Sequence, residues 1–166
     1  MRRRTGFIAM IGSIAIVTGG VAAWVSPVTT ASAGASQIEV FKPDGPYERV
    51  VDVGKRGIGA GDQILQSQPL LDPSDGSKVG RAVARVELVK HNERDDLVII
   101  DATIQVEGGD IVVYGAARLS QLETGATFAV TGGTGAYDAT AGTMTATVEE
   151  ISGTTGVLLS FDLATA

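Results

Sequence analysis

The stretch FAVTGGTGAYDATAG, from Phe128 to Gly142, decides the fold of this chain. A short apolar run leads into the segment from Thr131 to Gly135, and the aromatic Tyr137 and a further glycine precede the next run. Glycine adopts backbone angles that other residues avoid, so three glycines within four positions predict a sharp, specified bend between two strands. The rest of the chain repeats this order of strand and turn.

Apolar runs of strand length alternate with turn-forming residues about every 8 to 12 positions, which is typical of an all-β sandwich or barrel. Short connections require antiparallel neighbours, and closure of the sheet removes its exposed edges. The sequence therefore predicts an all-β fold, a single eight-stranded antiparallel closed β-barrel without amphipathic helices. The expected strands are Gln37–Lys42, Asp62–Leu71, Val79–Lys90, Leu97–Glu107, Asp110–Gln121, Thr127–Thr131, Thr143–Ile151 and Thr155–Leu163.

The run Leu97–Glu107 shows the clearest alternation of apolar and polar residues. Because successive side chains of a strand point to opposite faces, one face is expected to be buried. Gly108–Gly109 follows and predicts a two-residue hairpin, since both positions can take a positive φ. The apolar face carries Val98, Ile100, Ala102, Ile104 and Val106.

The first residues have the order of a secretory signal peptide. Arg2, Arg3 and Arg4 are followed by an apolar run from Phe7 to Val25 and by small residues ending at Ala33. We expect residues 1–33 to be removed and the protein to be secreted, with no membrane association after cleavage. A retained membrane anchor is the alternative, because the apolar run approaches the length of a span.

The expected mature chain, residues 34–166, has the size of one domain. Residues 34–61 hold the first strand and an irregular segment rich in glycine and proline, and residues 62–166 hold the remainder of the barrel. This part carries all 19 acidic and 10 of the 13 basic residues, a net charge of −9. Such a surface repels phosphate backbones, so nucleic acid is not an expected partner.

Two counts limit the chemistry further. The chain has no cysteine, which excludes disulfides, zinc–thiolate sites and cysteine nucleophiles. His91 is its single histidine, so neither a catalytic triad with histidine nor a histidine-rich metal site can be built. We therefore expect no metal site.

Two motifs carry a family resemblance. The run GDIVVYGAARL and the following TGATFAVTGGTGAYDATAG, within Gly109–Gly142, resemble the allene oxide cyclase family. The run GDQILQSQPLLDPSDGSKVGRA, Gly61–Ala82, resembles the dirigent proteins, with their "PL" pair, loop and "VGRA" strand. The resemblance covers Gly61–Leu163. It implies an eight-stranded antiparallel barrel that assembles as a homotrimer and takes a small, largely apolar molecule at its mouth.

Both families act mainly by positioning a reactive molecule, which implies that no cofactor is needed. The chain departs from their patterns at several places. Ala141 stands where dirigent proteins usually carry an arginine, and Ser67 and Gln68 replace their acid pair. A glutamate on the first strand matters in the cyclases, and Glu39 is the only acid on the first strand here.

Polar residues that share a strand face are the candidates for a site. Arg81 and Arg85 lie on one face of their strand, where two guanidinium groups could bind a carboxylate or enolate. A solvated outer face with weak ion pairs is the alternative. Asp101 and Gln105 form a second polar face. The candidate ligand-binding residues are Arg81, Arg85, Asp101, Gln105, Arg118 and Tyr137.

Glu39 and Tyr114 are the candidate catalytic residues. Tyr114 shares a face with Arg118, an arrangement suited to general acid catalysis or oxyanion stabilisation if that face is buried. For Tyr137, which follows the glycine bend, packing over the turn is the alternative to ligand contact.

The leading functional hypothesis is an exported barrel that steers the cyclisation or isomerisation of an apolar small molecule without a cofactor. The alternatives are a non-catalytic stereo-directing or ligand-binding barrel and a purely structural secreted domain. Whether the protein is an enzyme is left open by the sequence.

Overall fold

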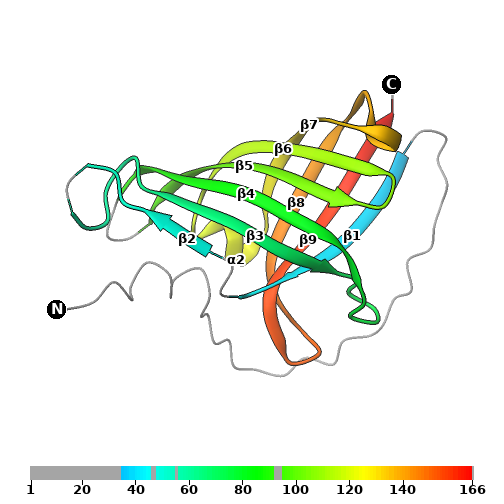
Figure 1. Ribbon diagram of the computed structural model, residues 1–166, viewed down its shortest axis with the longest axis horizontal. Helices are drawn as coiled ribbons and strands as arrows, with labels where there is room; N and C mark the ends of the chain where they lie inside the picture. Colours follow the sequence, from blue (N-terminus) through cyan, green and yellow to red (C-terminus); the bar gives the residue numbers. More distant parts are fainter. Residues whose placement is uncertain (1–34, 46–47, 55, 92–94, 166) are drawn as a thin grey trace.

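Figure 1 shows a computed structural model of the chain, which describes residues 35–45, 48–54, 56–91 and 95–165. The predicted signal peptide, residues 1–33, lies outside the described residues. No helix within the described ranges is both long and apolar enough to cross a membrane.

Eight antiparallel strands form a closed barrel. The strand order is β1-β9-β8-β7-β6-β5-β4-β3, and pairing of Phe41 with Leu71 joins β3 back to β1. This confirms the predicted fold. The strands of the ring are β1 (Ala35–Pro43), β3 (Gln63–Leu71), β4 (Lys78–Lys90), β5 (Leu97–Val106), β6 (Gly109–Arg118), β7 (Ala126–Gly133), β8 (Thr140–Ile151) and β9 (Thr154–Thr165).

Side chains alternate between the lumen and the outer surface, as the pattern in β5 predicts. Val98 and Ile104 are 1% and 2% exposed, whereas Gln105 on the other face is exposed. The apolar faces build two clusters inside the barrel. The larger includes Phe128, Met144 and Phe161, and the smaller consists of Ile64, Val86, Leu88 and Val98.

The structure corrects the predicted elements in two segments. The stretch expected to be irregular contains β2 (Glu48–Val51), which pairs with β3 outside the closed ring. The β-branched residues of β2 favour an extended strand, and the many glycines nearby concealed this signal. The strand expected to reach Gln121 stops at Arg118 and is followed by a short helix, α2 (Gln121–Thr124). There the Gln121 side chain accepts a hydrogen bond from the Arg118 amide at 2.7 Å.

The hairpin after β5 is shifted by one residue from its predicted position. Val106 pairs with Gly109, so the two loop residues are Glu107 and Gly108 rather than Gly108 and Gly109. Gly108 supplies a positive φ of 94° at the second loop position.

The glycine bend connects β7 to β8 and docks onto this hairpin. A 3-10 turn, η1 (Gly135–Tyr137), follows β7, and the Ala136 amide donates to the Gly108 carbonyl at 2.9 Å. Gly135 has a φ of 63°, and a Cβ there would collide with that same carbonyl oxygen. The Tyr137 hydroxyl donates to the Glu107 carbonyl at 3.2 Å. The bend therefore needs glycine both for its backbone angle and for this close approach.

Candidate functional site

A cavity of about 90 Å³ lies in the lumen, and members of both apolar clusters line it. Four alanines contribute to its wall, and two of them, Ala84 and Ala102, face each other directly in the register of β4 and β5. A methyl side chain reaches only a short way into a barrel, so these positions leave space that larger residues would fill. The remaining two are Ala82 and Ala146.

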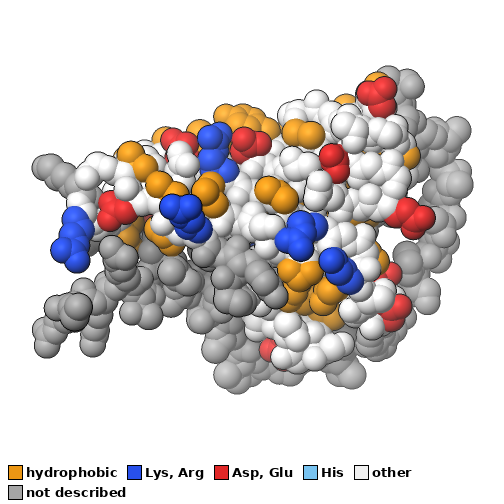
Figure 2. All heavy atoms as spheres, viewed as in Figure 1, with side chains coloured by type: hydrophobic (Ala, Val, Ile, Leu, Met, Phe, Trp, Pro, Cys, Tyr) orange, Lys and Arg blue, Asp and Glu red, His pale blue; other side chains and the backbone are white. Residues whose placement is uncertain are grey.

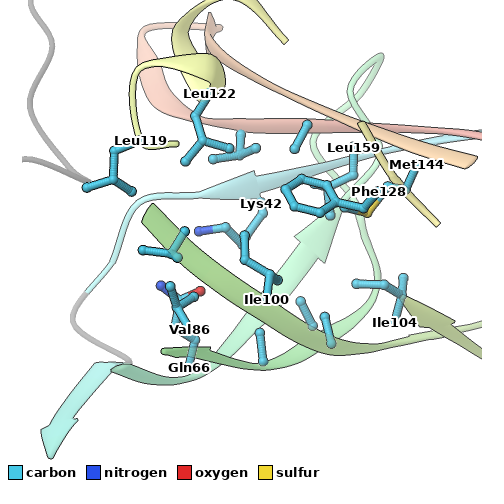
Figure 3. A pocket seen from close by; sticks show the side chains of 16 residues that line it. Lys42, Gln66, Val86, Ile100, Ile104, Leu119, Leu122, Phe128, Met144 and Leu159 are labelled. Carbon is cyan, nitrogen blue, oxygen red and sulfur yellow. The ribbon is translucent and has the colours of Figure 1, made fainter. Parts of the chain in front are cut away.

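The lining is apolar apart from two side chains. Phe128, Met144 and Leu159 lie together at one end of the cavity, as Figure 3 shows. Lys42 from β1 and Gln66 from β3 lie toward the other end. Ligand pockets commonly combine an apolar wall with a few fixed polar groups that orient the ligand. The cavity is smaller than the engineered 150 Å³ cavity known to bind benzene, so it takes a compact apolar group as it stands.

Lys42 and Gln68 form a buried polar pair across the junction of β1 and β3. The Lys42 ammonium donates to Gln68 Oε1 at 2.7 Å, and the two residues are 8% and 0% exposed. Gln68 Nε2 has no hydrogen-bond partner among the described residues. This pair brings a cation and an amide to the part of the lumen where β1 and β3 close the ring.

Asp44, just beyond β1, responds to the same surroundings. Burial raises the pKa of its carboxyl, and the nearby Lys42 charge opposes that rise. Its amide donates to the Thr155 carbonyl at 3.0 Å, which fixes the chain as it leaves β1. A carboxyl group of raised pKa therefore lies within electrostatic reach of the lumen lysine.

The segment between β6 and β7 forms another part of the wall. Leu119 and Leu122 line the cavity and are half-buried, so the cavity approaches solvent there. The Leu119 amide donates to the Asp96 carbonyl at 3.0 Å, and the Leu122 amide donates to the Leu119 carbonyl at 3.1 Å. These bonds position two apolar side chains at the boundary between lumen and water.

The predicted site residues lie elsewhere. Arg85 and Asp101 form an ion pair of 3.3 Å on the outer wall, with 48% of each side chain exposed. Tyr114, directly opposite Asp101 in the register of β5 and β6, is 51% exposed. Figure 2 shows charged side chains scattered over the viewed face of the molecule. The structure thus brings Arg85, Asp101 and Tyr114 together outside the lumen, as the alternative of a solvated face describes.

The other candidates are distributed around the surface. Arg81 donates to Ser67 Oγ at 2.8 Å and is the register neighbour of the exposed Gln105. Arg118 lies 3.7 Å from Asp95. The exposed Glu39 accepts a hydrogen bond from Ser160 at 3.2 Å.

Tyr137 packs at the glycine bend described above, partly buried against the larger cluster. None of the eight candidates is among the residues that line the cavity. A catalytic or binding role for any of them stays a prediction.

Sequence reasoning missed the polar residues of the lumen, although the chain carries a signal for them. Lys42 occupies the same strand face as the buried Val40, and Gln66 and Gln68 share the face of the buried Ile64 and Leu70. A polar residue at an inward position of an alternating strand is unusual and points to a buried hydrogen bond or a ligand. No group of three or more acidic or histidine side chains suited to a metal ion occurs within the described residues.

Comparison with solved structures identifies similar barrels. A pyocyanin demethylase superposes with a TM-score of 0.63 at 24% identity, over 78% of this chain and 99% of that one. A pterocarpan synthase dirigent protein gives a TM-score of 0.60 at 21% identity, over 80% of this chain and 95% of that one. A Diels–Alderase from Streptomyces koyangensis gives 0.63 at 12% identity, over 80% of this chain and 64% of that one.

No protein-family model matches the chain, and no curated protein sequence matches it. At these low identities the structural matches establish the fold alone. The predicted likeness to the dirigent and cyclase-like barrels is confirmed at that level.

Proposed function

We propose that this barrel binds a small, largely apolar molecule in its lumen and steers the cyclisation or isomerisation of that molecule without a cofactor. The observation that carries the proposal is the cavity between the two clusters, walled by alanines and entered near Leu119 and Leu122. Positioning reactive groups in a restricted apolar space favours one ring closure over others, because the entropy of alignment has already been lost on binding.

The similar barrels support the same kind of activity. One is described as a pterocarpan synthase dirigent protein and another as a Diels–Alderase, and both descriptions concern the formation of rings. We extend this general chemistry to the present chain as a proposal. Export of the protein and its assembly as a trimer are parts of the same proposal, and they rest on the sequence alone.

A barrel that binds and orients a ligand without any chemistry of its own is the second candidate. It is favoured by Gln68, which stands where dirigent proteins carry an acid and is buried in this barrel. A neutral amide neither gives up nor accepts a proton at ordinary pH. A ligand would then be held while its reaction proceeds by its own reactivity.

A substitution that fills the cavity tests the proposal. Ala84→Leu adds bulk to the cavity wall at a half-buried position, so the barrel can accommodate it. Val83→Leu, on the exposed face of the same strand, is the matched control. The two variants and the unmodified protein are incubated with small epoxides, quinone methides and conjugated dienes, and product ratios are measured by chiral chromatography with mass spectrometry.

We expect the unmodified protein and the Val83→Leu variant to enrich one stereoisomer, and Ala84→Leu to lose at least about tenfold of that enrichment, or about 1.4 kcal/mol of selectivity. Binding of these compounds without altered products would favour the non-catalytic candidate. Product ratios identical to those in buffer, together with no binding of any compound, would contradict both candidates.

A further inference from the structure

We propose that Lys42 and Gln68 form a recognition site for an oxygen anion, so that the ligand of the lumen is a compact apolar molecule with a deprotonated acid, enol or phenol at its leading end. This inference rests on the proposed function, because it assigns the polar group of the molecule that the lumen binds. The argument depends on the direction of hydrogen bonding, on burial and on the charge of the lining.

The amide of Gln68 has a defined orientation. An ammonium group donates hydrogen bonds and cannot accept them, so the Gln68 atom that lies 2.7 Å from Lys42 Nζ must be the oxygen. The Nε2 group then points away from Lys42 and offers two hydrogens. Gln68 is 0% exposed, and Nε2 has no partner among the described residues. A buried donor without a partner is costly, and an acceptor oxygen on a ligand would remove that cost.

Lys42 supplies a positive charge to the same place. It is 8% exposed and lines a cavity whose other lining residues, apart from Gln66, are apolar. Electrostatic attraction is stronger in such surroundings than in water, so an anion in the lumen is favoured over a neutral molecule of the same shape. A cationic ligand is disfavoured for the same reason. The pair therefore selects for charge as well as for hydrogen-bonding capacity.

Asp44 is the protein's own rival anion for Lys42. Burial raises the pKa of Asp44 despite the nearby lysine, which shows that its charged form is poorly solvated where it lies. Asp44 is not among the residues that line the cavity. An anionic ligand would approach Lys42 from the lumen, a different direction from that of the chain leaving β1.

A purely structural role is the competing explanation. The bond from Lys42 to Gln68 joins β1 to β3 near the Phe41–Leu71 pair, where the ring closes. This explains why Gln68 Oε1 is bonded, but it leaves Nε2 buried without a purpose. Recognition of an oxygen anion accounts for both atoms of the amide.

Three probes of one shape test the inference: hexanoate, hexan-1-ol and hexylamine, titrated into the full chain by calorimetry. A linear chain is narrow enough to enter a small cavity, and the three probes differ mainly in their head groups. The protein carries a net charge of −6, so unspecific attraction disfavours hexanoate. We expect hexanoate to bind at least about tenfold more tightly than hexan-1-ol, as is typical of a hydrogen bond to a charged group, and hexylamine to bind most weakly.

Variants then separate recognition from structure. Lys42→Met removes the charge, and Lys90→Met removes an exposed lysine at the end of β4 as its control. Gln68→Leu removes the free donor, with Gln105→Leu on an exposed face as its control. We expect Lys42→Met to reduce hexanoate affinity to that of hexan-1-ol while leaving hexan-1-ol binding unchanged. Gln68→Leu should lose part of the preference, and both controls should keep it.

Each remaining outcome counts against a defined claim. Binding of hexan-1-ol with no preference for hexanoate overturns the anion site but leaves the apolar pocket of the proposed function intact. Absence of binding by all three probes overturns both. An equal loss of hexanoate binding in Lys90→Met would assign the preference to general charge. If Lys42→Met fails to fold, the more conservative Lys42→Gln is read in its place, and an unchanged preference in that variant overturns the site.

Discussion

Inward positions of the strands show how single residues determine what the lumen can do. Replacing an apolar side chain by Lys42 or Gln68 costs burial of polar groups, which a barrel core normally avoids. Alanine at Ala84 and Ala102 costs packing, because their short side chains leave a cavity. The barrel accepts both costs in one region, which is the pattern expected of a binding site rather than of a core packed for stability alone.

The outer face carries a residue whose ionisation opposes folding. Burial, and to a smaller extent the charge of Glu39, raise the pKa of the Glu149 carboxyl above its usual value near 4.5. A carboxyl group with a raised folded pKa favours folding while protonated, and this contribution is lost as the pH rises through that pKa. At neutral pH the ionised Glu149 is therefore mildly destabilising.

We expect Glu149→Gln to increase the free energy of unfolding at pH 7 by a few tenths of a kcal/mol, since the site is only partly buried. The gain should disappear as the pH falls below about 4.5, where Glu149 itself is protonated. Urea unfolding at a series of pH values measures the effect. Glu150→Gln, at the next position of β8, is the control, and an equal gain from it at pH 7 would show that only net charge matters.

At the scale of elements, strands could be predicted wherever apolar and polar residues alternate. This holds for β5, where Val98 to Val106 lie inward as expected. Alternation alone does not say which face is inside when both carry small residues, and for that reason Arg81 and Arg85 could not be assigned. β2 was hidden because its strand is short and gains stability from pairing with β3, a contact between distant parts of the sequence.

The polar site was hidden for a related reason. Lys42 and Gln68 are 26 positions apart, and only closure of the ring brings them into contact. A sequence pattern indicates that each faces inward, but it does not indicate that they meet. The glycine bend, in contrast, is a local feature and was predicted from its own residues.

The glycine bend should be intolerant of a side chain. We expect Gly135→Ala to lower the free energy of unfolding by about 2 kcal/mol or more, because alanine is strained at a positive φ and its Cβ would displace the β5–β6 hairpin. Gly59→Ala is the control, since a Cβ there meets no atom within 4 Å. Chemical denaturation measures both variants. A loss in Gly135→Ala no greater than that of the control would contradict the docking of this bend.

At the scale of the whole molecule, closure leaves an outer wall that mixes charged residues with exposed apolar ones. Leu65, Val83 and Tyr114 project outward from β3, β4 and β6 and are 38%, 43% and 51% exposed. The family resemblance implies a homotrimer, and apolar groups on an outer wall are compatible with contact between subunits.

We expect the secreted protein to begin at Gly34 and to sediment with three times the mass of the processed chain at micromolar concentration. Mass spectrometry of the exported protein and analytical ultracentrifugation measure these two properties. A sharp monomer peak would contradict the trimer, and an exported protein that retains residues 1–33 would favour the membrane anchor.

The alanine wall has a consequence for how such a scaffold can diversify. The empty space arises from side chains that are short, while the hydrogen-bonded ladder of strands around it is regular. Exchanging these alanines for glycine, valine or leucine would enlarge, narrow or abolish the bore without altering the pairing of the strands. Selectivity for guests of different girth can therefore evolve through single substitutions, independently of the residues that make the ring close.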